Sequence, residues 1–201
     1  MPFCRYCRCI ALAALLIVPL ALLSATPGHA AASAPRVLLK TSLGDITLEL
    51  NASKAPKTVA NFLEYVKSGF YKGTVFHRVI NGFMIQGGGH DTAMNLKSTN
   101  PAIENEADNG LKNQAYTIAM ARTQDPHSAT AQFFINVANN TFLDHTAKTP
   151  SGWGYTVFGR VVDGASVVDA IKAVPVKNAG YMQNVPVTQV VILDAVLLPA
   201  Q

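Results

Sequence analysis

Polar side chains interrupt a strongly apolar stretch between Phe76 and Ile85. Arg78 and Gln86 stand among large apolar residues, and the three glycines that follow allow another group to approach the backbone closely. With both residues on strands, this placement predicts a polar edge on an apolar surface, where a guanidinium could meet a bound group. The alternative is an arginine that extends to solvent beside a simple glycine turn. The stretch alone does not decide between them.

Two later segments, residues 117–123 and 128–136, combine small alanines with aromatic residues. The alanines keep the local surface low. Phe133 and Phe134 are adjacent, and neighbours on a strand point to opposite faces. One phenylalanine can therefore join the core while the other lines a groove. The alternative is that both belong to the core.

The sequence gives little support for a hydrolase or a metal-binding protein. Ser128 does not stand in a Gly-x-Ser-x-Gly elbow, and no acidic residue is obviously paired with His77. The histidines at 77, 90, 127 and 145 lack the close spacing of a zinc site, and all three cysteines precede residue 10. We therefore expect no metal, no cofactor and no hydrolytic nucleophile.

Short strands and two helices must position these residues. Runs at 37–41 and 46–50 predict a hairpin, because the second run alternates strictly between apolar and polar residues. Apolar residues at i, i+3, i+4 and i+7 predict a helix from Pro56 to just before Gly69, and a second helix is expected at 165–172. Further strands are expected at 74–79, 83–86, 116–121, 133–137, 156–162 and 189–197. The pattern predicts an all-β domain with two helices but not how its sheet closes.

The first thirty residues have the pattern of a cleaved secretory signal peptide. Arg5 and Arg8 precede an apolar run at 10–23, and small residues around Ala30 suit a cleavage site. The run is shorter than the roughly 20 residues of a membrane span, and the alternative of an N-terminal core helix would need a core around it. We expect a signal peptide at 1–30 and one mature domain at 31–201, without cysteine and without a membrane anchor.

The charge pattern gives no support for a nucleic-acid partner. Loss of Arg5 and Arg8 lowers the net charge from +4 to +2, and the remaining basic residues are scattered. No exposed apolar helix face or heptad pattern stands out. We therefore expect a monomer.

The segment from Phe76 to Gly88 resembles the cyclophilin signature. The segments 132–135 and 157–162 resemble its later motifs, and the likeness runs from about Val37 to Leu198. Residues 119–123 and 142–145 resemble the bacterial periplasmic branch. The resemblance implies a mainly β fold, a closed eight-stranded antiparallel barrel capped by two α-helices. It also implies a periplasmic peptidyl-prolyl cis-trans isomerase that acts on proline-containing polypeptides and unfolded exported proteins.

The same resemblance implies a role for each part of the candidate site. Arg78 matches the catalytic arginine, and His77 supports it from the neighbouring position. The walls of the proline pocket are matched by Phe83, Met84, Phe134 and Leu143. Gln86 and Gln132 match the polar groups that hold the substrate backbone, and Ala121 and Arg122 match the segment beside the residue before proline. Phe142 and Tyr155 are also expected to bind substrate.

Four positions depart from the family pattern. Asn81 replaces a frequent proline, and Arg122 replaces an asparagine whose backbone can still bind. Phe142 stands where cyclosporin-sensitive members carry tryptophan, so the loss of an indole N–H donor implies weak inhibition by cyclosporin. Tyr155 occupies a position often held by histidine, which argues against an obligatory histidine there.

A proline-segment-binding chaperone without obligatory turnover would use the same surface. The intact Arg78 favours an enzyme over this alternative, because pure binding gains little from a donor directed at a twisted amide.

Overall fold

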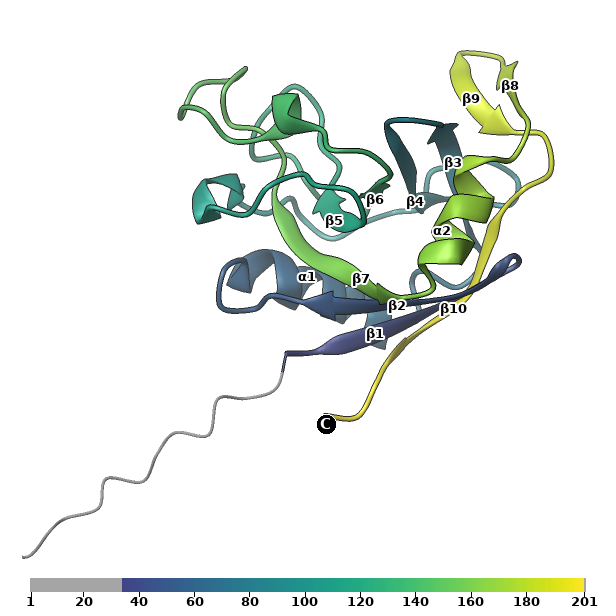
Figure 1. The fold of residues 1–201 in the computed structure, drawn as a ribbon, viewed down its shortest axis with the longest axis horizontal. Helices are drawn as coiled ribbons and strands as arrows, with labels where there is room; N and C mark the ends of the chain where they lie inside the picture. The colour runs from purple at the N-terminus through teal and green to yellow at the C-terminus, as the bar shows by residue number, and fades with distance from the viewer. Residues whose placement is uncertain (1–33, 201) are drawn as a thin grey trace, which may run out of the picture. The chain divides into compact units, whose positions relative to one another are not determined.

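The computed structural model describes residues 34–200, so the expected signal peptide at 1–30 lies outside the described residues. Eight strands form a closed antiparallel barrel in the order β1-β10-β3-β4-β6-β5-β7-β2 (Figure 1). Its strands are β1 (Arg36–Thr41), β2 (Gly44–Leu50), β3 (Thr74–Ile80), β4 (Met84–Asp91), β5 (Thr117–Met120), β6 (Phe133–Asn136), β7 (Val157–Asp163) and β10 (Val191–Leu197). The expected barrel fold is confirmed.

Two helices close the interior of the barrel. The helix α1 (Pro56–Lys67) begins with Pro56 in its first turn, as expected, and α2 (Ala165–Lys172) has the bounds that the sequence predicts. Phe62 from α1 and Ile171 from α2 are fully buried in the same hydrophobic core as the inner barrel residues. Within residues 34–200, no helix is both long and apolar enough to cross a membrane.

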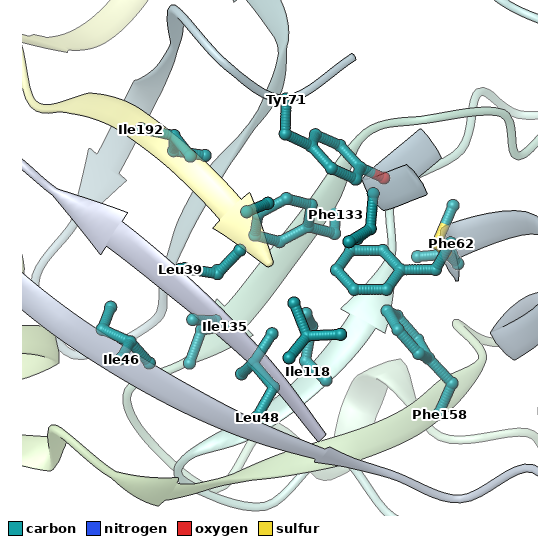
Figure 2. Packing of buried hydrophobic residues seen from close by; sticks show 14 of the residues in the cluster. Leu39, Ile46, Leu48, Phe62, Tyr71, Ile118, Phe133, Ile135, Phe158 and Ile192 are labelled. Atoms are coloured by element: carbon teal, nitrogen blue, oxygen red, sulfur yellow. The ribbon is translucent and has the colours of Figure 1, made fainter. Parts of the chain in front are cut away.

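The centre of this core is a group of aromatic rings around Phe133 (Figure 2). The Phe133 ring centroid lies 5.7 Å from that of Phe62, 5.5 Å from Tyr71 and 6.1 Å from Phe76, each in an edge-on arrangement. Such edge-to-face pairs add to the stabilisation that burial gives. Aromatic residues between Phe62 and Phe76 therefore pack against a phenylalanine from the distant strand β6.

The glycine run at 87–89 serves this core. The strand was expected to end at Gln86, but β4 continues through the glycines to Asp91. A Cβ atom on Gly88, which has φ +79°, would lie 2.7 Å from the Phe133 ring and 2.9 Å from the Tyr71 ring. The glycines are therefore not a simple turn, because aromatic core side chains pack against Gly87 and Gly88 and the Gln132 side chain packs against Gly89.

A second, two-stranded sheet was not expected. It consists of β8 (Val176–Ala179) and β9 (Met182–Pro186), and Figure 1 shows this hairpin projecting beside α2 and β3. Every residue of β8 is exposed, so the segment has no alternation of buried and exposed positions from which a strand could be predicted. Two short 3₁₀ helices at Ala107–Asn109 and Thr141–Leu143 complete the described elements.

Candidate active site

The candidate site lies on the outer face of four neighbouring strands, β3, β4, β6 and β5. Arg78 pairs with Gln86, Gln86 with Phe134, and Phe134 with Ala119, so these four residues form one row across the sheet. Residues directly opposite each other in a ladder share a face. On this row the side chains point away from the barrel core.

The neighbouring rows point inward. One consists of Val79, Ile85, Ile135 and Ile118, and the other of Phe76, Gly87, Phe133 and Met120. Apart from Gly87, every residue in these two rows belongs to the main core. The sheet therefore separates the interior of the barrel from the candidate site by the thickness of one strand layer.

A β-bulge at His77 turns Arg78 to the outer face. Phe76 pairs with Gly87 and Arg78 with Gln86, so two steps on β3 correspond to one step on β4. Without the extra residue, strict alternation would place Arg78 on the inner face with Phe76. Bulges redirect side chains in this way near active sites. His77 is thus the residue whose insertion brings the arginine to the site.

Three polar side chains form a hydrogen-bonded line on the outer face. Nη1 of Arg78 donates to Oε1 of Gln86 at 3.4 Å, and Nε2 of Gln86 donates to Oε1 of Gln132 at 3.1 Å. The guanidinium carbon of Arg78 lies 6.0 Å from the ring centroid of Phe83. Gln132 lies so close to Gly89 that a Cβ atom there would meet its side chain at 2.3 Å. The line places Arg78 beside apolar residues and limits the directions in which its guanidinium can point.

Beside this polar line lies a second hydrophobic cluster, which we call the outer cluster. It is separate from the barrel core. Its buried members are Met84, Ala119, Phe134, Leu143 and Val157, and its partly buried members are Ile80, Phe83, Leu111, Ala121 and Tyr155. Phe133 therefore packs in the barrel core and Phe134 in the outer cluster, which confirms that adjacent phenylalanines serve opposite faces.

Aromatic residues form the rim of the outer cluster. The Phe142 side chain is 73% exposed, and its ring centroid lies 5.5 Å from that of Phe83. The Tyr155 ring meets Phe134 edge-on at 5.7 Å. Exposed aromatic surface next to buried apolar side chains is suited to contact with an apolar ligand.

The Arg122 side chain lies over Tyr155 at the rim of the outer cluster and is hydrogen-bonded to the adjoining loop. Its Nε donates to the carbonyl oxygen of Gly154 at 2.9 Å and its Nη1 to that of Thr123 at 2.8 Å. The guanidinium carbon lies 4.5 Å from the Tyr155 ring centroid. These contacts hold the Arg122 side chain at the rim and leave the backbone at Ala121 and Arg122 beside the cluster.

A chain of buried asparagines, which was not expected from the sequence, fixes the backbone of the cluster. Nδ2 of Asn140 donates to the Phe83 carbonyl oxygen at 2.8 Å and to Oδ1 of Asn136 at 2.7 Å. Asn136 donates to Oδ1 of Asn113 at 3.2 Å, and Asn113 donates to the Leu143 carbonyl oxygen at 3.1 Å. All three asparagines are buried. Asn136 ends an apolar strand, which was the one available signal in the sequence.

His77 lies beneath this surface, next to His90, which was not among the expected site residues. The ring centroids of His77 and His90 are 4.3 Å apart. Burial, together with the neighbouring His90 and Arg78, lowers the pKa of His77 from 6.5 to about 4, although the Val75 carbonyl opposes this shift. Burial also lowers the pKa of His90. Both rings are therefore neutral at pH 7.

The structure gives no support to a serine hydrolase site. The Ser128 hydroxyl donates to the carbonyl oxygen of Asp125 at 2.7 Å and accepts from the Thr123 amide at 2.9 Å. Nδ1 of the adjacent His127 accepts instead from the Asn105 amide at 3.1 Å. Within residues 34–200, no hydrogen bond joins Ser128 to a histidine, so the activated hydroxyl that acyl transfer needs is not assembled.

Comparisons with known proteins agree with this geometry. Residues 36–197 match the family described as cyclophilin type peptidyl-prolyl cis-trans isomerase/CLD. The chain is 64% identical over 162 residues to peptidyl-prolyl cis-trans isomerase cyp18 of Streptomyces antibioticus, covering 81% of this chain and 98% of the relative. It is 52% identical over 185 residues to peptidyl-prolyl cis-trans isomerase A of Dickeya dadantii, covering 92% and 96%.

A solved structure has the same fold. It is the cyclophilin type peptidyl-prolyl cis-trans isomerase of Cryptosporidium parvum, crystallised in the presence of the dipeptide Ala-Pro. The TM-score is 0.67 at 28% sequence identity, and the match covers 82% of this chain and 99% of the other.

Proposed function

Because the chain belongs to the cyclophilin-type peptidyl-prolyl cis-trans isomerases, we propose that Arg78 is the group through which it accelerates rotation about X–Pro bonds. The observation that supports this assignment is the position of Arg78. Its side chain lies at the edge of the outer cluster, hydrogen-bonded to Gln86 and directed away from the barrel core. The outer cluster then holds the proline ring, and Gln86 and Gln132 hold the substrate backbone.

The reaction explains why an apolar surface and a single donor suffice. The barrier to rotation about a peptide bond is about 18–20 kcal/mol, because conjugation gives the C–N bond partial double-bond character. At the top of the barrier this conjugation is broken, and the prolyl nitrogen regains its lone pair. The Arg78 guanidinium donates a hydrogen bond to that nitrogen. The planar ground state offers no such acceptor, so the bond stabilises the transition state selectively.

The size of this effect limits what Arg78 contributes alone. A hydrogen bond that involves a charged group contributes about 1.5–3 kcal/mol, which corresponds to roughly one to two decades in rate. Further acceleration comes from fixing the proline ring and the flanking backbone on the outer cluster and excluding water there. Arg78 therefore makes the most specific contribution to the rate acceleration but does not account for all of it.

An isomerisation assay on a short Ala-Pro peptide tests the assignment. We expect Arg78→Ala to keep the fold and to lose at least about tenfold in kcat/KM, the lower limit set by one charged hydrogen bond. Arg78→Lys keeps the charge but not the planar fork of donors, so we expect it to remain impaired. Near-normal activity in the alanine variant would remove Arg78 from this role.

We also propose that the protein acts in the periplasm as a monomer and assists the folding of unfolded exported proteins. The support is the signal-like segment at residues 1–30 and the cysteine-free chain that follows it. N-terminal sequencing of protein recovered from the periplasmic fraction tests the proposal. Cleavage near Ala30 is expected, whereas an intact N-terminus in the cytoplasmic fraction would contradict it.

We further propose that cyclosporin inhibits the enzyme weakly. Phe142 is exposed at the rim of the outer cluster but has no N–H donor. Phe142→Trp supplies one, and a hydrogen bond contributes about 0.5–1.5 kcal/mol, so cyclosporin should bind up to about tenfold more tightly. An inhibition titration without any gain in affinity would show that this loop is aligned wrongly with the family.

A further inference from the structure

A second hollow lies next to Arg78, on the side away from the outer cluster. Its volume is about 350 Å³, and it is lined by His77, Arg78, His90, Tyr181, Met182 and Gln183. The last three come from the β8–β9 hairpin, whose strand β9 packs beside β3 (Figure 1). Arg78 is thus shared between the candidate catalytic surface and this hollow. A ligand bound here would lie within reach of a substrate held at Arg78.

Two neutral histidine rings line the hollow. His77 is only 8% exposed, and its ring centroid lies 4.3 Å from that of His90. Burial lowers the pKa of both histidines, so neither ring carries a charge at pH 7. Nδ1 of each ring has no hydrogen-bond partner among the residues that the structure describes, but both atoms are closed off from solvent. A ligand in the hollow therefore meets the rings and not these nitrogens.

The lining favours an aromatic organic group over a metal ion. Residues 34–200 contain no group of three or more His, Cys, Asp or Glu side chains arranged to hold a metal, and the Arg78 guanidinium would repel a cation. The imidazole rings, the Tyr181 phenol and the Met182 thioether all make favourable contacts with an aromatic ring. The Arg78 guanidinium can lie against the face of such a ring.

The order of the strands indicates which part of a substrate reaches the hollow. Ala121 and Arg122 follow β5, whereas Arg78 is on β3, at the opposite side of the row that crosses β4 and β6. The family resemblance places the residue before proline beside Ala121 and Arg122. An extended chain that continues across the outer cluster and past Arg78 would therefore bring the residue after proline to the hollow.

We propose that this hollow is a specificity subsite for an aromatic side chain directly after proline. Phenylalanine and tyrosine are both preferred over alanine and aspartate, because the histidine rings, the Tyr181 phenol and the Met182 thioether make favourable contacts with an aromatic ring. The subsite rests on the proposed function, since its ligand belongs to an X–Pro substrate. The β8–β9 hairpin then contributes to substrate binding, because Tyr181 and Met182 cover the bound ring.

Isomerisation of Ala-Ala-Pro-Xaa peptides, followed by NMR exchange, tests the subsite without a coupling protease. With Xaa as Tyr, Phe, Ala or Asp, we expect KM for Tyr and for Phe to be roughly fivefold below that for Ala, as expected for a gain of about 1 kcal/mol from aromatic contacts. Tyr181→Ala should reduce this preference to less than about twofold by raising KM for the aromatic peptides. Tyr181 is 89% exposed, so the variant is not expected to disturb the fold.

Two further variants make the result specific. Met182→Ala removes the thioether that lines the hollow, so it should also weaken the aromatic preference. Val187→Ala removes an exposed apolar side chain just beyond β9 that does not line the hollow, and it should preserve the whole pattern. Equal KM values for all peptides in the unmodified protein, a preference for Asp, or an aromatic preference that survives Tyr181→Ala would each overturn the subsite. Failure to isomerise even the Ala peptide would instead contradict the proposed function.

Discussion

Arg78 lies directly opposite Gln86 in the β3–β4 ladder, with Nη1 of Arg78 3.4 Å from Oε1 of Gln86. Phe76, two residues before Arg78, faces the barrel core. The change of face depends on the bulge at His77. One inserted residue therefore converts a position of the inner row into the polar edge of the outer cluster, and several measurable consequences follow from this geometry.

Replacement of Gln86 tests whether its contact orients Arg78. Gln86→Leu removes the acceptor for the guanidinium and the donor to Gln132. We expect kcat/KM for an Ala-Pro peptide to fall about tenfold, since a bond to a charged group is worth at least about 1.5 kcal/mol. Gln86→Glu keeps an acceptor for Arg78 and should retain more activity. Equal activity of the two variants would argue that the contact has no role in orientation.

The buried asparagines should matter for stability. Asn140→Ala removes the donor to the Phe83 carbonyl, which still accepts from the Val137 amide, and the donor to Oδ1 of Asn136, which is left buried without it. One unpaired buried group is destabilising by about 1–3 kcal/mol, so we expect a loss of this size in the free energy of unfolding from denaturant titration. Asn139→Ala is the control, because its one hydrogen bond, to the Ala115 amide, is exposed. Similar losses in the two variants would contradict this assignment.

Two glycine substitutions separate backbone strain from steric conflict. Gly88 has φ +79° and Gly110 has φ +85°, so alanine is strained at both positions. At Gly88 the new Cβ also meets Phe133 and Tyr71, whereas nothing lies within 4 Å at Gly110. Overpacking of a core adds about 1–3 kcal/mol, so Gly88→Ala should lower the melting temperature further than Gly110→Ala. A larger effect at Gly110 would mean that β4 shifts easily to accommodate the new side chain.

The buried His77 should make stability depend on pH. In the unfolded chain its pKa is near 6.5, and in the folded protein it is about 4. Between these values the unfolded state binds more protons, so stability falls as the pH falls. The contribution is on the order of 3 kcal/mol at about 1.4 kcal/mol for each pKa unit. His77→Phe should therefore flatten the unfolding free energy measured between pH 6.5 and pH 4; an unchanged slope would show that His77 titrates normally.

Residue pattern alone accounted for most elements of the barrel but not for its closure or its site. Helix α2 and the β1–β2 hairpin were predicted because their apolar residues follow a clear period. The bulge at His77 could not be predicted, because it interrupts the alternation on which strand prediction depends. The hairpin β8–β9 gave no signal because its first strand is exposed on all sides.

Long-range contacts account for the features of the site that the sequence did not predict. The asparagine chain joins residues from two loops and one strand, and the pairing of Asn113 with Asn136 has no local signature. The pair His77 and His90 likewise depends on the register of β3 and β4. The barrel closure and the roles of the site residues came from family resemblance, whereas the side-by-side placement of Arg78, Gln86 and Phe134 came from the structure.

The most direct test compares binding and turnover of one Ala-Pro peptide in the same samples by NMR exchange spectroscopy. Arg78→Ala should leave Kd for the peptide within about threefold, because the outer cluster still holds proline, while the exchange rate of the bound peptide falls at least about tenfold. A variant that binds and exchanges the peptide like the unmodified protein, or that loses affinity and rate in equal proportion, would contradict the claim that Arg78 stabilises the twisted amide.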